Sequence, residues 1–561
     1  MARLAFLGVL LAATACGFDG GGPSGPDDDD GDEAGADAGG AVEACAVGAP
    51  GDELEVATTR GLVRGERDGE VLRFRGIPFA APPVGERRFR APEAHACWDG
   101  VRDATAFGAM CPQSPVPGGA LHGDEDCLFL NVWTPEARAE EPRPVLFWIH
   151  GGAQVMGSAG DGVGPLSYDG RWLAEREGVV VVSANYRLGA LGFLAHPALD
   201  ADSADGVSGN YGLRDLVAAL AWVQENADAF GGDPARVMVF GESAGAFNTC
   251  GLVASPLARG LFSAALMESG ICDAPTLAER ETRGALVAGA VGCDGDDAAA
   301  CLRDAAVEDL VATGAVEMGA MFGTPEQPID PHHVMDLPFG LAVDGVVLPR
   351  SPRAQMAAGQ HNRVPIVIGT NANEHDLFIP PGTVTSCTAY AQRLEQALGD
   401  ELGAAVAEEY PCPSWWEAQA TFSDAMSDMT FTCPSRRAAR AARAGQAEPV
   451  HRYLYTHRRE QGPLALVRAA HTLEIPFVFG TVGTAEEPAT EAEYNMSRVI
   501  GRYWTRLARA GDPNGGDDAS WDACSDADCD EILRLDTDGG MSGAAATAHC
   551  DFWDAVVGQG E

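Results

Sequence analysis

The sequence predicts an α/β fold, in which helices cover both faces of a mainly parallel β-sheet. Short, fully apolar runs at 145–150, 179–182 and 237–240 indicate buried strands. A segment with helical periodicity at 211–230 stands between the last two of these runs. Because buried strands that alternate with helices pair in parallel, this pattern favours one sheet that is covered on both sides.

The other expected elements extend this pattern along the chain. Residues 54–76 predict two or three short strands with glycine turns, and the helix over 211–230 ends at Gly231 and Gly232, which form a C-cap before Pro234. Further strands are expected at 128–133, 264–268, 364–370, 451–455 and 532–535, and helical segments at 278–313, 388–442 and 493–510. With no repeat and no second linker, we expect one domain over 54–556.

The charge of the chain excludes one class of partner. The 561 residues include 82 acidic and 38 basic side chains, for a formal net charge of −44. Phosphate would be repelled, so nucleic acid is not an expected partner. Beyond the N-terminus there is no apolar run of about 18 residues, so no membrane-spanning helix is expected in the mature chain.

The N-terminus has the pattern of a targeting segment over residues 1–16. Arg3 precedes an apolar run at 4–13, which has the length of a signal peptide. The run ends in Ala13-Thr14-Ala15-Cys16, which resembles a bacterial lipoprotein signal in which Cys16 is lipidated. Ordinary secretory cleavage near Ala15 is the alternative. The sequence therefore predicts an exported protein, either an outer-membrane lipoprotein anchored only through Cys16 or a secreted protein.

Residues 17–53 follow as an expected flexible tether, since they contain 11 acidic and no basic side chains and cannot form a core. The cysteine content fits export. The chain has 15 cysteines, and removal of Cys16 leaves 14, an even number that suggests disulfides. Metal ligation is not supported, because no CxxC pair lies near a pair of histidines.

The turn Gly241-Glu242-Ser243-Ala244-Gly245 carries the clearest chemical signal. An apolar strand leads into it and a small-residue, helix-compatible run follows. This context is typical of a nucleophile elbow, which exposes the serine and directs the next backbone N–H toward a developing oxyanion. A glycine-rich loop with an unused serine is the alternative when the pentapeptide is taken alone.

A serine nucleophile needs a base and a carboxylate that orients the base, in the chain order serine, acid, histidine. Glu374 follows the expected strand at 364–370 and is the leading acid, with Asp376 as the fallback. His471 lies in a loop after the last long strand, where the base belongs. The alternatives are His375, His451, His457 and His549.

His150-Gly151-Gly152-Ala153 ends a central strand and offers oxyanion donors. Two backbone N–H groups there, together with that of Ala244, can converge on one oxygen. A plain glycine turn is the alternative.

Five segments, two of which contain the turns just described, resemble the type-B carboxylesterase family, which includes cholinesterases and bile-salt-activated lipase. They are Phe74–Ala80, Glu125–Trp133, Trp148–Ala153, Asn185–Gly189 and Phe230–Gly245. The resemblance covers about 55–555 and implies an α/β-hydrolase fold. It also implies a triad of Ser243, Glu374 and His471, oxyanion donors from Gly152, Ala153 and Ala244, and a supporting role for Glu242 beside the nucleophile.

The resemblance also implies three disulfides, Cys111–Cys127, Cys293–Cys301 and Cys433–Cys550. Proximity or elimination alone suggests Cys45–Cys97, Cys387–Cys412 and Cys524–Cys529. Cys250, in the run after the elbow, is expected to be a free thiol in the core.

The chain departs from the family pattern at His375, where glycine is usual, and at Gln154, where an aromatic residue is usual. Both bear on the shape of the pocket and leave the catalytic groups intact. The sequence thus predicts a serine hydrolase that cleaves small-molecule carboxylic esters through an acyl-enzyme, with no metal or organic cofactor. A lipase for long-chain esters is the alternative. A non-catalytic adhesion protein is disfavoured because serine, acid and histidine are all present.

Overall fold

The structure is a computed structural model. It describes residues 45–114, 119–136, 139–160, 167–317, 329–331, 337–483, 488–525, 528–538, 541–542 and 549–558. The expected targeting segment and the tether up to residue 44 lie outside these residues. Within them, no helix is both long and apolar enough to cross a membrane.

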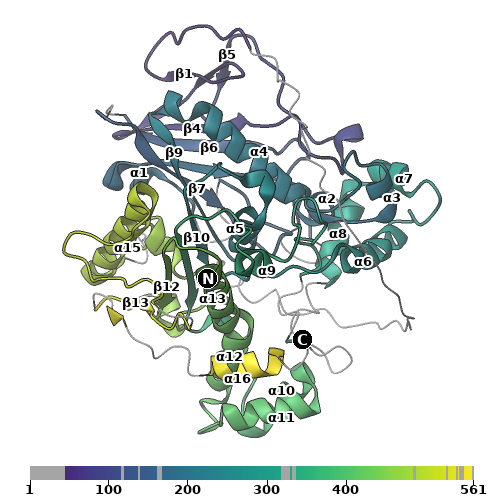
Figure 1. The fold of residues 1–561 in the computed structure, drawn as a ribbon, viewed down its shortest axis with the longest axis vertical. Coiled ribbons are helices and arrows are strands. Elements are labelled where there is room, and N and C mark those ends of the chain that lie inside the picture. The colour runs from purple at the N-terminus through teal and green to yellow at the C-terminus, as the bar shows by residue number, and fades with distance from the viewer. Residues whose placement is uncertain are drawn as a thin grey trace.

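A mixed β-sheet of eleven strands runs through the described residues (Figure 1), in the order β14-β13-β12-β11-β10-β9-β7-β8-β6-β4-β3. Its strands are β3 (Glu66–Asp68), β4 (Val71–Pro78), β6 (Phe129–Pro135), β7 (Arg143–Ile149), β8 (Val180–Ala184), β9 (Gly232–Glu242), β10 (Ala264–Glu268), β11 (Ile366–Asn371), β12 (Val450–Tyr455), β13 (Leu533–Leu535) and β14 (Met541–Ser542). A second, three-stranded sheet consists of β1 (Glu55–Ala57), β2 (Leu62–Arg64) and β5 (Val101–Asp103).

Parallel pairing holds from β8 through β13, as the apolar runs predict. The edges are antiparallel, with β3, β4 and β6 on one side and β14 on the other. The difference follows from the connections. Only two residues join β3 to β4, which suffices for a hairpin, whereas parallel neighbours need a crossover segment.

Alternate residues of the central strands face two separate cores. In β7, Phe147 packs in the core that also holds Leu216 of α4 (Tyr211–Asn226). Trp148 packs in the opposite core with Trp504 of α15 (Glu491–Ala510). Because successive strand side chains point to opposite faces, a fully apolar strand is explained by burial on both sides.

The remaining helices complete the two layers and one lobe. They are α1 (Arg171–Glu177), α2 (Gly189–Phe193), α3 (Pro197–Ala201), α5 (Ala244–Ala254), α6 (Leu277–Ala290), α7 (Ala298–Asp304), α8 (Val307–Glu317), α9 (Pro352–Ala357), α10 (Cys387–Leu398), α11 (Asp400–Glu409), α12 (Ala418–Ser427), α13 (Cys433–Gly445), α14 (Ile475–Val478) and α16 (Cys550–Gly558). Figure 1 shows α10, α11, α12 and α16 together at one end of the molecule. Their apolar side chains form a third core, to which Phe422 and Trp553 belong.

Seven disulfides use every cysteine of the described residues. Six are the pairs expected above. The seventh, Cys250–Cys272, shows that the expectation of a free thiol at Cys250 is wrong. Helix α5 packs over β10, and Cys272 lies four residues beyond that strand, so the two Cα atoms are 5.4 Å apart. The local sequence contains no pattern that predicts this packing of α5 on β10.

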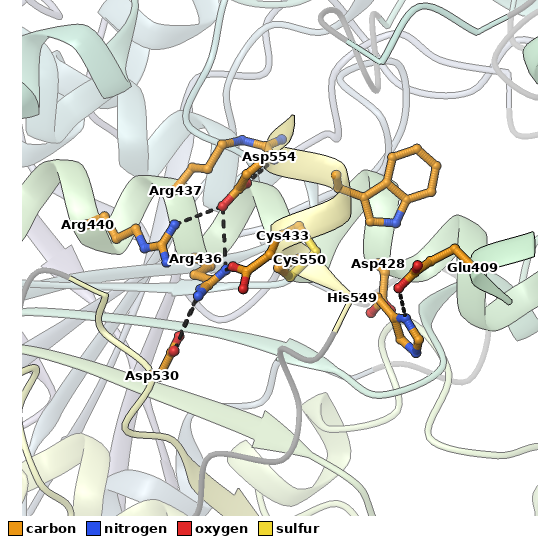
Figure 2. The surroundings of a disulfide bond; sticks show 12 residues. Glu409, Asp428, Cys433, Arg436, Arg437, Arg440, Asp530, His549, Cys550 and Asp554 are labelled. Atoms are coloured by element: carbon orange, nitrogen blue, oxygen red, sulfur yellow. Dashed lines mark hydrogen bonds and ion pairs between the residues drawn. A yellow bond between two sulfur atoms is a disulfide. The ribbon is translucent and has the colours of Figure 1, made fainter. Parts of the chain in front are cut away.

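The disulfide Cys433–Cys550 fastens α16 to the start of α13 and spans 117 residues of sequence (Figure 2). Arginines of α13 surround it. Arg436 pairs with Asp530 and Asp551, while Arg437 and Arg440 both pair with Asp554. We call this disulfide and its ion pairs the C-terminal clamp.

Candidate active site

Ser243 stands at a sharp turn between β9 and α5. Its backbone has φ 57° and ψ −124°, a conformation that costs a non-glycine residue of the order of 1–3 kcal/mol. The Ser243 N–H donates to the carbonyl of Glu268 on the neighbouring β10, at 2.9 Å. The strand, the strained turn and the helix form the elbow that the sequence predicts.

The two glycines of the elbow are required by close packing. A Cβ atom on Gly245 would lie 2.0 Å from the carbonyl oxygen of Ile149, and one on Gly241 would lie 2.7 Å from the same oxygen. The elbow therefore presses against the end of β7, which leads into the predicted oxyanion loop, residues 150–154.

This oxyanion loop lies directly against the serine. A Cβ atom on Gly151 would be 3.1 Å from the Cβ of Ser243. Gly152 and Ala153 adopt φ values of 111° and 54°. Among the described residues, the N–H groups of Gly152, Ala153 and Ala244 meet no hydrogen-bond acceptor. Three unpaired donors beside one hydroxyl can stabilise an oxyanion that forms there.

Glu374 and His471 meet on the other side of the site. Glu374 lies in a single turn, Glu374–Asp376, just after β11, and its Oε1 accepts the N–H of Asn371 at 2.7 Å. Its Oε2 is 2.7 Å from Nδ1 of His471. Both side chains are buried. This contact orients the imidazole and leaves Nε2 facing Oε1 of Glu242, the residue before Ser243, at 3.1 Å.

These neighbours set the charge of His471. Burial alone would lower its pKa, but the carboxylates of Glu242 and Glu374 outweigh burial and raise the pKa of His471 to about 9. Burial also raises the pKa of Glu242, and this shift is opposed by the charge of His471. The two carboxylates thus stabilise the imidazolium form of His471.

Aromatic and apolar side chains enclose the site. The rings of Phe378 and Phe431 lie 5.1 Å and 5.0 Å from the ring of His471. Phe247, Ile271 and Leu337 form a small apolar cluster against Ala153 of the oxyanion loop. This cluster offers an apolar wall for part of a substrate.

The alternative acid and bases lie elsewhere. Asp376 forms an ion pair with Arg468 at 2.6 Å. The other four histidines each have their own contacts: His375 with Thr430, His451 with the ring of Trp521, His457 with Asp536 and Glu493, and His549 with Glu409. None of these side chains makes a hydrogen bond to Glu374 in the part of the chain that the structure describes.

Sequence reasoning missed two buried carboxyls close to the site. Glu268 accepts a hydrogen bond from Nε1 of Trp504 at 2.7 Å. Glu474 contacts Nδ2 of Asn371, and burial raises its pKa to about 7. The signal for Glu474 was present, since it is an acidic residue within the apolar segment from Leu473 to Phe479.

Comparison with known proteins now adds to this geometry. The model of the carboxylesterase family matches residues 52–553. The chain belongs to the carboxylesterase family. Like its relatives, this family member is a carboxylic ester hydrolase with the α/β-hydrolase fold.

Three relatives of this family member illustrate the similarity. The para-nitrobenzyl esterase of Bacillus subtilis (strain 168) is 35% identical over 86% of this chain and 95% of its own. The fumonisin B1 esterase of Sphingopyxis macrogoltabida is 36% identical over 83% of each chain, and the cocaine esterase of Homo sapiens is 34% identical over 89% of each. The solved structure of a PNB esterase matches with a TM-score of 0.74 at 34% identity, covering 90% of this chain and all of that one.

Proposed function

We propose that this esterase cleaves small-molecule carboxylic esters through an acyl-enzyme on Ser243. The observation that carries the proposal is the set of three unpaired N–H groups, from Gly152, Ala153 and Ala244, around a strained serine. The acid and base of the proposed triad, Glu374 and His471, are 2.7 Å apart on the same site.

In the first half-reaction, Oγ of Ser243 attacks the ester carbonyl carbon while Nε2 of His471 takes the hydroxyl proton. The carbonyl oxygen becomes an oxyanion, which the N–H groups of Gly152, Ala153 and Ala244 stabilise. The intermediate then expels the alcohol, which takes the proton from His471.

In the second half-reaction, a water molecule attacks the acyl-enzyme. His471 takes the proton of the water and returns it to Oγ of Ser243, so the acid is released and the serine is restored. Glu374 stabilises the imidazolium in both halves. Glu242 faces Nε2 of His471 at 3.1 Å and also favours the imidazolium.

We propose that a fluorophosphonate, which reacts with serine nucleophiles, labels Ser243. Peptide mapping by mass spectrometry should find the adduct there, Ser243→Ala should lose it, and Ser255→Ala should keep it. An adduct on another serine would contradict the assignment. A series of aryl esters from acetyl to palmitoyl separates the two substrate classes, because a rising kcat/KM toward long chains would favour the lipase alternative.

For the whole chain we propose one catalytic domain over 54–556 and anchoring through a lipidated Cys16. The seven disulfides are compatible with export. Lipidation would hold the enzyme at the cell envelope, so Cys16→Ser should move activity from the membrane fraction to the soluble fraction. Unchanged fractionation would favour ordinary secretion.

A further inference from the structure

Gln154 is a fully buried polar residue at the end of the oxyanion loop. It is 0% exposed, and its backbone adopts a φ of 63° directly after the two proposed loop donors. A buried amide without partners is costly, so its contacts matter. Its backbone carbonyl accepts the N–H of Gly189 at 2.6 Å, while its side chain turns to α5.

The side-chain amide of Gln154 forms a reciprocal pair with Asn248. Nε2 of Gln154 donates to Oδ1 of Asn248 at 3.0 Å, and Nδ2 of Asn248 donates to Oε1 of Gln154 at 3.1 Å. Nε2 of Gln154 also lies 3.4 Å from the carbonyl oxygen of Ala244, which fixes the orientation of the amide. Asn248 is 0% exposed as well.

This amide pair connects the two segments that supply the unpaired N–H groups. Gln154 follows the loop donors Gly152 and Ala153, and Asn248 lies one turn along the helix from Ala244. The start of the loop is held by Tyr186, whose hydroxyl donates to the carbonyl of His150 at 2.9 Å and also interacts with the side chain of Asn248. The oxyanion loop is thus fixed at both ends.

The loop needs such restraint because Ala153 and Gln154 both have positive φ. This conformation is unfavourable for a non-glycine residue and persists only where the surroundings hold it. Without the pair, the loop could relax and carry its N–H groups away from that of Ala244. Hydrogen bonds to an oxyanion are effective only when the donors are already in place.

We propose that Gln154 and Asn248 are a positioning pair, which sets the separation between the loop donors and the Ala244 N–H and thereby stabilises the tetrahedral intermediate. The proposal rests on the proposed role of Gly152, Ala153 and Ala244 as oxyanion donors. Both side chains are fully buried, so we expect ester binding to depend little on the pair. Loss of the pair should therefore lower kcat.

The first test is Asn248→Leu, which removes both amide bonds and the contact with Tyr186 while keeping the branched shape and the number of side-chain heavy atoms. We expect kcat for a p-nitrophenyl ester to fall by roughly 10- to 100-fold with KM within about twofold. The affinity of a trifluoromethyl ketone, which forms a tetrahedral adduct with a serine, should fall by the same factor as kcat/KM. The matched control is Thr249→Val, which removes the adjacent buried bond from Thr249 Oγ1 to the Gly245 carbonyl. It should leave kcat unchanged.

Two double variants separate positioning from stability. Gln154→Met with Asn248→Leu replaces both amides by apolar groups, so thermal stability should recover while kcat stays low. Exchange of the two residues, Gln154→Asn with Asn248→Gln, retains two facing amides of the same combined length and should restore part of kcat. Wild-type kcat in Asn248→Leu, or recovery of kcat together with Tm in the apolar double variant, would overturn the proposal.

The proposed function and the positioning role can be contradicted separately. If Ser243→Ala keeps its activity, the assignment of the nucleophile is wrong. If Ser243 is required and labelled but Asn248→Leu turns over at the wild-type rate, only the positioning role is wrong.

Discussion

The candidate active site and the C-terminal clamp both join distant parts of the chain, but they do so by different means. In the site, one 2.7 Å contact links Glu374 to a histidine 97 residues later. In the clamp, a covalent bond spans 117 residues and several ion pairs surround it. The exposed side chain of Asp551 in the clamp contrasts with the buried Glu374.

This difference predicts two kinds of sensitivity. The polar groups of the site are buried and each has its own function, so no neighbouring group can replace one that a mutation removes. In the clamp, Asp554 pairs with three arginines, Arg436, Arg437 and Arg440, so the loss of one arginine leaves Asp554 with partners. We therefore expect site variants to act mainly on turnover and clamp variants to act mainly on stability.

The largest expected effect is that of His471→Ala. Loss of the proposed base should lower kcat by roughly 10⁴-fold or more, because members of a triad act as a unit. Steady-state kinetics with a neutral aryl ester measure this, with circular dichroism to confirm folding. The control is His451→Gln, at a buried histidine of β12, which should stay within about threefold of wild type. The reverse pattern would place the base elsewhere.

The second-largest expected effect is a loss of stability when the C-terminal clamp is broken. Replacing Cys433 and Cys550 by serine should lower the free energy of unfolding by up to about 5 kcal/mol, because the bond closes a loop of 117 residues. The matched control removes Cys293–Cys301, which closes only 8 residues and should cost about half as much. Denaturant unfolding measures both. Equal losses, or a collapse of kcat in the folded fraction of the first variant, would contradict the comparison.

The smallest effect is a pH shift within the site. The pKa of His471 is raised to about 9 in part by Glu242, and the imidazole must be unprotonated to act as a base. Glu242→Gln removes that charge, so the pKa of His471 should fall. The acidic limb of kcat/KM should then move to lower pH by at least about one unit. Glu177→Gln, at the end of α1, should leave the limb in place.

Local sequence was enough to suggest one half of the candidate site. Ser243 lies in a short motif whose strand, glycines and helix are adjacent in the chain, and the oxyanion loop follows a single apolar strand. The prediction of Glu374 and His471 required more than local sequence. Only the order of elements along the chain and the family resemblance favoured them over Asp376 and the other histidines.

Packing between elements could not be predicted in the same way. The Cys250–Cys272 bond, the amide pair of Gln154 and Asn248, and the two rings beside His471 all join segments that are remote in sequence. The fold shows the same division. Apolar runs predicted the doubly buried central strands, whereas the short edge strand β14 and the seven-residue helix α1 have too little pattern to be recognised.

The length of the loop that the clamp closes has a consequence for how the protein matures. During synthesis Cys433 is translated first, and its partner Cys550 is translated 117 residues later. Until then α16 is missing, and the third core lacks Trp553 against side chains such as Phe422 and Met429. That incomplete lobe exposes apolar surface and is prone to aggregate. An oxidant that acts too early could also pair Cys433 with one of the cysteines already delivered. The last step of maturation is therefore expected to be slow, and to benefit from disulfide exchange that corrects an early wrong partner.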